Sequence, residues 1–390
     1  MRPLSKRMLA VKPSPTIVMN SRAAALAREG KPVISFAVGE PDFATPKPIV
    51  ERAIEGLRAG HTKYGAAGGG PDLRGAISAK LKNENKLEFA PEQIVVGIGA
   101  KEILFHLMLA LINEGDEVII PAPYWVSYAD QVIAAGGKPI VLPLPEGFPE
   151  TGFDVELIEL HATSRTVAIL LNSPNNPTGY TFSETELKDL GKLLKKKDWW
   201  IISDEIYEYH SFERPHHSIL NFFPELKDRF FYVNGFSKSF AMTGWRVGYV
   251  AGPKEPIGIV RSLQSHSSTC LPGFIEDAAI VAIQGGKFLV VQELSELNTR
   301  RKLAIKEISK ISGLKVGAPH GAFYLFCDVR SKTQDSMKFC EGLLLEKHVV
   351  TVPGEAFGAP GFFRMSYAVS DKKLIDGIQR IKEFFESKVV

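Results

Sequence analysis

Short apolar runs alternate with helical stretches through the middle of this chain, and this alternation most constrains its fold. The runs lie at residues 94–96, 117–120, 167–171, 199–202, 230–233 and 246–251. Apolar runs of this length, bounded by turn residues, are typical of strands that are buried on both faces. The sequence therefore predicts an α/β fold in which helices sandwich a mostly parallel central sheet.

The pattern changes beyond about residue 285, where we expect a smaller α+β unit. A charged helix at 287–311 leads to an apolar strand at 322–328, another helix, a short strand at 363–367 and a final helix. A chain of 390 residues has room for two such units. We predict three parts: an N-terminal arm that joins the small unit (residues 1–47), a large domain (48–284) and a small C-terminal domain (285–390).

The composition is typical of a globular protein, with 45% apolar residues, 23% charged residues and a net charge of only +3. This balance gives no indication of nucleic-acid binding. The cysteines, Cys270, Cys327 and Cys340, lack the spacing of a metal site or a disulfide, so we expect reduced thiols, no metal and a cytoplasmic location. The longest apolar stretch, 103–112, is about half the length that a bilayer requires, so no membrane partner is expected.

Four segments follow predicted strands, which is where open α/β sheets place ligands. In the first, residues 97–101, glycines precede a helix and leave backbone amides free for an anion. A dinucleotide fingerprint would require a third glycine where Glu102 stands, so a single phosphate fits better. A glycine turn that binds nothing is the alternative. The second segment, 172–179, is rich in turn-forming residues that need no ligand to explain them.

The other two segments carry an acid and an amine. Asp204 follows an apolar run, and a carboxylate there is costly unless a cation meets it; a structural ion pair is the competing interpretation. Lys238 follows another run among small and apolar residues, where loss of solvent lowers the pKa of the amine and makes it a usable nucleophile. Arg246 is suited to bind a phosphate.

These segments together resemble the motifs of class I pyridoxal-phosphate (PLP) aminotransferases. Residues 235–248 are similar to the family's lysine-attachment signature, and residues 175–179 and 203–207 are similar to two further motifs in the family's order. Segments near both ends resemble the bacterial aspartate aminotransferase subgroup, namely residues 12–16, 39–43, 353–358 and 363–367. The resemblance covers roughly the whole chain.

The resemblance implies a fold type I PLP enzyme that moves an amino group between an L-amino acid, aspartate before others, and 2-oxoglutarate in a PLP/PMP ping-pong cycle. Lys238 would carry the cofactor as a Schiff base and move the proton between the substrate Cα and the cofactor C4′. Asp204 would pair with the pyridine nitrogen, and Asn176 and Tyr207 would bind the ring hydroxyl. Trp125 would stack on the ring and border the substrate.

The resemblance also assigns the groups that bind anions. The cofactor phosphate would be held by Gly99, the amides of Ala100 and Lys101, Ser237, Arg246 and, from a second subunit of a homodimer with shared sites, Tyr64. Arg364 would bind the substrate α-carboxylate as a bidentate pair, helped by Asn176 and the backbone of Gly39. Lys12 would favour a second carboxylate through a charge-assisted hydrogen bond.

Two departures from the subgroup leave the substrate side chain open. Gly65 follows Tyr64 where the subgroup usually has threonine, and residues 267–273 differ from the subgroup in a loop that faces the partner's active site in the family. Leu271 and Pro272 in that loop could suit aromatic or aliphatic side chains. An aromatic, broad or prephenate specificity is therefore an alternative.

Other readings concern the chemistry itself. A PLP-dependent carbon–sulfur lyase or cyclopropane-forming synthase would share the fold and the lysine. A non-enzymatic regulator is disfavoured because the chain has no room for an added DNA-binding domain before residue 30. A nicotinamide-dependent dehydrogenase is disfavoured because the glycine fingerprint is incomplete.

Overall fold

Seven strands form the largest sheet, in the order β2-β8-β7-β6-β5-β3-β4. The computed structural model describes residues 2, 4–11, 13, 15–148, 151–317 and 319–387. The strands of this sheet are β2 (Ile94–Ile98), β3 (Glu117–Pro121), β4 (Lys138–Leu142), β5 (Thr166–Asn172), β6 (Trp200–Asp204), β7 (Phe230–Gly235) and β8 (Val247–Ala251). β8 runs antiparallel to both of its neighbours, and the other strands all point the same way. The predicted mostly parallel sheet is confirmed.

Burial on both faces explains why these segments form strands. All residues of β7 and β8 are buried, as the continuous apolar runs predict. β4 lies at the edge of the sheet and was not predicted, because its exposed Lys138 and its proline interrupt the apolar pattern.

The antiparallel strand brings its own start to the edge where the parallel strands end. Val247, the first residue of β8, pairs with Ile98 at the end of β2, and Gly248 pairs with Gly235 at the end of β7. The prediction that this strand begins at Arg246 is wrong by one residue. Arg246 has φ +57°, which turns it out of the strand and places it at this edge.

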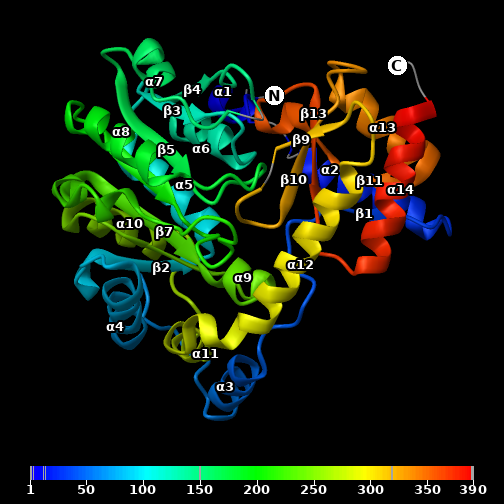
Figure 1. Ribbon diagram of the computed structural model, residues 1–390. Helices are drawn as coiled ribbons and strands as arrows, with labels where there is room; N and C mark the ends of the chain where they lie inside the picture. Colours follow the sequence, from blue (N-terminus) through cyan, green and yellow to red (C-terminus); the bar gives the residue numbers. More distant parts are fainter. Residues whose placement is uncertain are drawn as a thin grey trace.

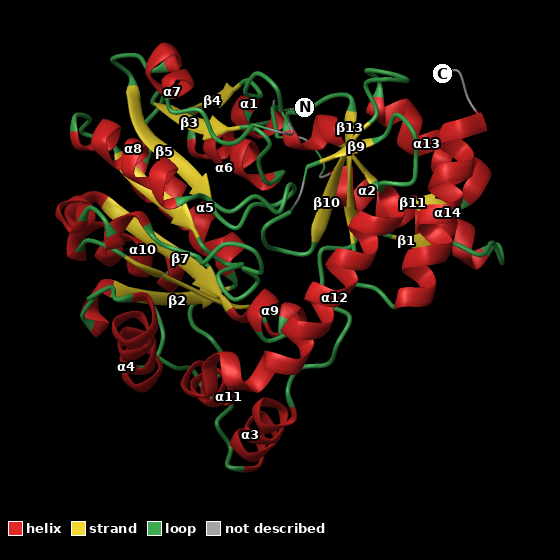
Figure 2. Ribbon diagram, viewed as in Figure 1, coloured by secondary structure: helices red, strands yellow, loops and turns green. Residues whose placement is uncertain are grey.

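Helices cover both faces of the sheet (Figure 2). One apolar core lies beneath α5 (Ala100–Leu111), α6 (Ser127–Ala135) and α10 (Lys254–Ser265). The other face is covered by α3 (Lys47–Arg58), α4 (Pro71–Lys80), α7 (Glu156–His161), α8 (Glu184–Lys195) and α11 (Gly273–Gly285). A capping box begins α8: the Ser183 hydroxyl accepts from the Glu186 amide, and the Glu186 carboxylate accepts from the Ser183 amide.

A second unit surrounds its own apolar core beyond α12 (Val291–Ile308), which runs diagonally between the two parts in Figure 1. Its four-stranded sheet has the order β12 (Val352–Pro353), β13 (Phe362–Ser366), β10 (Tyr324–Asp328) and β9 (Lys315–Val316), flanked by α13 (Ser336–Lys347) and α14 (Asp371–Ser387). The predicted helix at 287–311 is shorter than expected because residues 286–290 form a 3₁₀ turn.

The N-terminal segment contains α1 (Lys6–Leu9), α2 (Pro15–Arg28) and β1 (Ile34–Ser35), and β1 pairs with β11 (Val349–Val350). Within this segment, α2 and β1 pack on the second unit, whereas α1 contacts α6 of the large unit. Phe36 and Ala37 are buried in the second core. The boundaries at residues 47 and 284 stay a prediction. Among the described residues, no helix is both long and apolar enough to cross a membrane.

Candidate functional site

Side chains from both units surround a cavity of about 250 Å³ at the carboxyl edge of the seven-stranded sheet. The cavity brings together most of the predicted site residues: Gly39, Ala100, Lys101, Trp125, Asn176, Asp204, Tyr207, Ser237, Lys238, Arg246 and Arg364. Gly99 is not itself a lining residue, but it directly precedes the lining residue Ala100 in the sequence. Lys12 lies outside the described residues, and Tyr64 is not in the cavity wall of its own chain.

One end of the cavity is built to hold an anion. Gly99 is the N-cap of α5, and it carries no side chain that could cap the first amides of this helix. Its φ is +81°, and a Cβ atom here would lie 2.5 Å from the Arg246 guanidinium, so only glycine allows the arginine to approach. Arg246 is held by the Thr243 carbonyl at 2.9 Å and the Ile98 carbonyl at 3.3 Å. A helix N-terminus beside a guanidinium is a ready-made phosphate site.

Asp204 supplies a buried carboxylate at the end of β6. The Tyr128 hydroxyl donates to its Oδ2 at 2.7 Å, and the Ile206 amide donates to its Oδ1 at 3.2 Å. Burial raises the pKa of this carboxyl group to about 6. The hydrogen-bond partners of this carboxylate among the described residues are the neutral Tyr128 hydroxyl and the Ile206 amide, so the competing interpretation as a structural ion pair is not supported.

Lys238 supplies the amine. It lies on the short helix α9 (Phe236–Ser239), and its Nζ donates to the Gly39 carbonyl at 2.7 Å. Burial, with the nearby guanidinium of Arg364, lowers the pKa of the amine to about 8, although the Glu40 carboxylate raises it. The neutral, nucleophilic form is therefore accessible close to neutral pH.

Arg364 supplies a second cation, on β13, with only 3% of its surface exposed. Its Nη1 donates to Asn176 Oδ1 at 2.9 Å and its Nη2 to the Ala37 carbonyl at 2.6 Å, while its buried Nε has no acceptor among the described groups. The backbone of Asn176 is fixed in turn, because its backbone N–H donates to Asn172 Oδ1 at 2.8 Å. A buried guanidinium with a free N–H is suited to a carboxylate ligand.

Three residues of the site were not predicted from the sequence. Tyr128 holds Asp204, and Asn172, whose side chain also donates to the Asp204 carbonyl at 2.9 Å, holds Asn176. Tyr324 contacts the Tyr207 hydroxyl at 2.8 Å. Asn172 was visible as the end of a strand before a turn. The two tyrosines carry no local signal, because each reads as an ordinary core aromatic.

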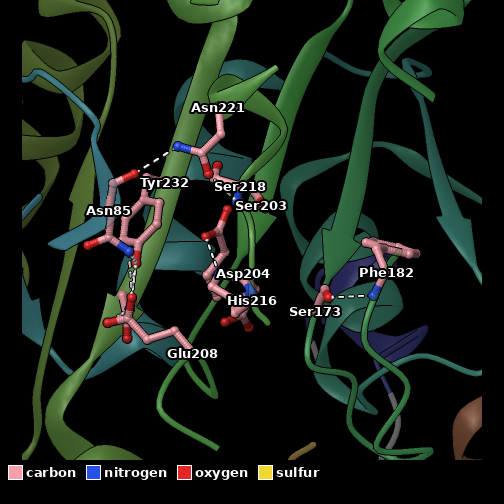
Figure 3. Close-up of polar contacts among 12 residues, drawn as sticks. Asn85, Ser173, Phe182, Ser203, Asp204, Glu208, His216, Ser218, Asn221 and Tyr232 are labelled. Carbon is pink, nitrogen blue, oxygen red and sulfur yellow. Dashed lines mark hydrogen bonds and ion pairs between the residues drawn. The ribbon is translucent and has the colours of Figure 1, made fainter. Parts of the chain in front are cut away.

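A buried polar network supports the turn that carries Tyr207. Figure 3 shows Glu208 close to Asn85 and Tyr232, which donate to its Oε2 at 2.7 and 2.9 Å. Lys80 forms an ion pair with the same carboxylate. In the neighbouring 172–179 loop, the Ser173 hydroxyl accepts a hydrogen bond from the backbone amide of Phe182 at 3.1 Å, which links the start of the loop to the segment that follows it.

Two predicted features lie outside the cavity. Tyr64 is 90% exposed. The next residue, Gly65, donates its amide to Cys270 Sγ at 3.3 Å, so both segments that depart from the subgroup lie side by side. Leu271 is only 1% exposed within its own chain, so the expectation that its side chain could contact a substrate is wrong.

The charges of the cavity wall are unequal. Four cations line it, Lys101, Lys238, Arg246 and Arg364, against Asp204 as the one carboxylate among the described lining residues. Lys101 is exposed, and its Nζ lies 4.9 Å from the centroid of the Trp125 ring. A nucleophilic amine, a buried carboxylate and a surplus of cations can bind and transform a multiply anionic ligand.

Comparisons with known proteins identify the family. The model of the family "Aminotransferase class I and II" matches residues 31–381. The "Probable aspartate/prephenate aminotransferase" of Aquifex aeolicus is 44% identical over 98% of both chains, and the "Aspartate aminotransferase" of Thermotoga maritima is 40% identical over 99% of this chain and all of its own. The solved structure of the aspartate aminotransferase from Thermus thermophilus with maleate has a TM-score of 0.93 at 38% identity, covering 98% of this chain and 100% of its own. This chain therefore belongs to the class I and II aminotransferase family, whose members are PLP-dependent enzymes.

Proposed function

We propose that this chain is an aspartate aminotransferase that binds PLP through Lys238 and moves an amino group between L-aspartate and 2-oxoglutarate. The observation that carries this proposal is the excess of cations in the cavity, four against one carboxylate among the described lining residues. A cofactor phosphate together with a substrate that has two carboxylates matches this excess. The names of the Aquifex and Thermotoga relatives support the same choice.

The described residues fit the cofactor. The uncapped start of α5, Ser237 and Arg246 would hold its phosphate. Asp204, a buried carboxylate without a salt bridge in the described chain, would meet its protonated ring nitrogen, and Asn176 and Tyr207 would meet the ring hydroxyl. When bound, PLP supplies an electron sink that stabilises negative charge at the substrate Cα.

The chain's own groups then position the substrate and move the proton. Arg364 binds the α-carboxylate, which orients the Cα–H bond in the cavity. Lys238 Nζ removes the proton from the substrate Cα, and its pKa of about 8 keeps a useful fraction of the amine neutral near neutral pH. The negative charge of Asp204 would keep the cofactor's ring nitrogen protonated, and two donors, Tyr128 and the Ile206 amide, favour the charged form of this carboxylate.

Discrimination between amino-acid side chains requires a cation of the cavity that binds neither the cofactor nor the α-carboxylate. Arg364 binds the carboxylate that every amino acid carries, and Arg246 and Lys238 serve the cofactor. Lys101 remains, and no salt bridge engages it among the described residues. We assign its ammonium to the second carboxylate of aspartate. Lys12, which the resemblance favours for this role, is the other candidate.

The test is kcat/KM for aspartate, phenylalanine, tyrosine, alanine and kynurenine with 2-oxoglutarate in excess, on PLP-loaded protein. Aspartate should exceed every neutral donor. Lys101→Met should lower the value for aspartate by about ten- to a hundredfold, the loss of one charge-assisted hydrogen bond, and leave that for alanine unchanged. Lys192→Met on the exposed face of α8 is the matched control. A tenfold preference for any neutral donor would overturn the assignment of aspartate.

Prephenate is a second candidate for the amino acceptor. The Aquifex relative is named for it, and prephenate also carries two carboxylates. The same cation surplus would suit it. Glutamate-dependent consumption of prephenate would establish this activity beside that on aspartate.

We further propose a homodimer in which Tyr64 reaches the phosphate of the partner's site, which gives the 90% exposed tyrosine a role.

The three free cysteines suit a reducing compartment such as the cytoplasm. We also keep the division of the chain at residues 47 and 284, since the two units have separate apolar cores.

A further inference from the structure

Tyr324 lies at the junction of the two units, where three parts of the site meet. It is the first residue of β10, in the small sheet, and it is fully buried. Its hydroxyl lies 2.8 Å from the Tyr207 hydroxyl, which the seven-stranded sheet carries in the turn after β6. Its ring lies beneath the Arg364 guanidinium, with 4.5 Å between the guanidinium carbon and the ring centroid.

The third contact is with the segment that holds Lys238. A Cβ atom on Gly39 would lie 2.7 Å from the Tyr324 hydroxyl, so this tyrosine packs directly against the residue whose carbonyl accepts from Lys238 Nζ. Glycine at position 39 allows that approach. Tyr324 thus contacts Tyr207, which is proposed to bind the cofactor hydroxyl, and Arg364, which is proposed to bind the α-carboxylate. It also contacts Gly39, whose carbonyl accepts from the Lys238 amine.

We infer that Tyr324 is a positioning residue that couples these groups: its hydroxyl strengthens Tyr207 as a hydrogen-bond donor, and its ring fixes the Arg364 guanidinium. The inference rests on the proposed function, which gives Tyr207 and Arg364 their ligands.

The hydroxyl acts through cooperativity. Either tyrosine oxygen can be the donor in the contact between them. When Tyr207 turns its proton to an anionic ligand oxygen, Tyr324 can donate to the oxygen of Tyr207. A phenol that accepts a hydrogen bond is itself a stronger donor. In a chain of hydrogen bonds inside the low-dielectric protein interior, each bond is strengthened by about 10–30%. Tyr324 therefore favours the deprotonated form of a cofactor hydroxyl that faces Tyr207.

The ring acts through cation–π attraction. Arg364 is buried between the ring of Tyr324 and that of Phe357, whose centroid lies 5.2 Å from the guanidinium carbon. Such contacts are stronger when both partners are desolvated. They hold the planar guanidinium in the orientation that two parallel hydrogen bonds to a carboxylate require.

Two variants separate these actions. Tyr324→Phe keeps the ring and removes the hydroxyl, whereas Tyr324→Leu removes both. Tyr367→Phe is the matched control, because Tyr367 is equally buried and donates to the Ala322 carbonyl at 2.9 Å instead of to the site. The readouts are the pKa at which the absorbance of protein-bound PLP titrates and the Kd for maleate, a dicarboxylate without an amino group, measured by calorimetry.

Tyr324→Phe should raise the pKa of the bound cofactor by about 0.3 and leave the maleate Kd within about twofold of wild type. Tyr324→Leu should show the same rise and a maleate Kd about fivefold higher. Tyr367→Phe should match wild type in both. A Tyr324→Phe protein that titrates like wild type would overturn the inference, and so would a Tyr324→Leu protein that binds maleate with the wild-type Kd.

Failure of the proposed function looks different. In that case wild-type protein itself would show no titrating PLP band and no absorbance change with aspartate. The maleate measurement on the cofactor-free variants would still decide whether the ring of Tyr324 supports Arg364.

Discussion

The Tyr128 hydroxyl donates a hydrogen bond of 2.7 Å to Asp204 Oδ2, and both residues are buried at the carboxyl edge of the seven-stranded sheet. With the Ile206 amide on the other oxygen, this bond fixes the orientation of the carboxylate. A carboxylate that is fixed in this way needs little rearrangement to meet a cationic ring nitrogen. Preorganised charge of this kind is a main source of catalytic power.

Asp204→Asn should fold normally and lower kcat by about a thousandfold or more, because a neutral amide cannot keep the ring nitrogen protonated. Tyr128→Phe should have a much smaller effect, since it removes one hydrogen bond and keeps the charge. Single-turnover rates with aspartate compare the two variants, and circular dichroism checks their folding. Near-normal turnover of Asp204→Asn would show that this carboxylate has only a structural role.

The rate at which cofactor-free protein captures PLP should depend on the protonation of Lys238. The pKa of this amine is lowered to about 8, and only its neutral form attacks. The rate should rise about tenfold per pH unit below pH 8 and level off above it. Stopped-flow absorbance measures it. Glu40→Gln should move the plateau to lower pH, because the Glu40 carboxylate raises the pKa of the amine. A rate that climbs steadily beyond pH 10 would indicate an unperturbed lysine.

The fold and most of the site were predictable because their signals are local. Continuous apolar runs mark strands buried on both faces, and the residues that end or closely follow these strands, such as Asn176, Asp204 and Lys238, carry the chemistry. The direction of β8 was not predictable, since it depends on pairing with β2 and β7. The role of Tyr128 depends on its contact with Asp204, which lies 76 positions away in the sequence. The role of Tyr324 depends on its contact with Tyr207, which lies 117 positions away, and no local pattern encodes either contact.

His210 should make the protein sensitive to acid. It is fully buried, neither ring nitrogen has a hydrogen-bond partner among the described groups, and burial lowers its pKa to about 3. An unfolded histidine has a pKa near 6.5, so between pH 6.5 and pH 3 only the unfolded chain takes up this proton and the free energy of unfolding falls as the pH falls. This loss amounts to about 2 kcal/mol at pH 5.

His210→Phe should remove that part of the pH dependence. Urea unfolding of cofactor-free protein at pH 7.5 and pH 5 measures it. The control is His217→Phe, because the side chain of His217 is 30% exposed. The variant should lose about 2 kcal/mol less than wild type between the two pH values. An identical loss in both proteins would contradict this account of His210.

Shared sites in a homodimer predict complementation between subunits. Tyr64→Phe and Lys238→Ala proteins should each be impaired. In a mixed dimer with shared sites, one site carries both changes and the other carries neither. Verified mixed dimers should therefore recover about half of the wild-type activity per dimer. No recovery would show that Tyr64 does not serve the partner's site.

The most direct test of the whole account is where the cofactor is attached. PLP-loaded protein is reduced with borohydride, digested and mapped by mass spectrometry, with Lys238→Ala treated in parallel. The account predicts one reduced cofactor per chain, on Lys238, and none in the variant. A stable tag on any other lysine, such as Lys101 in the same cavity, would contradict it.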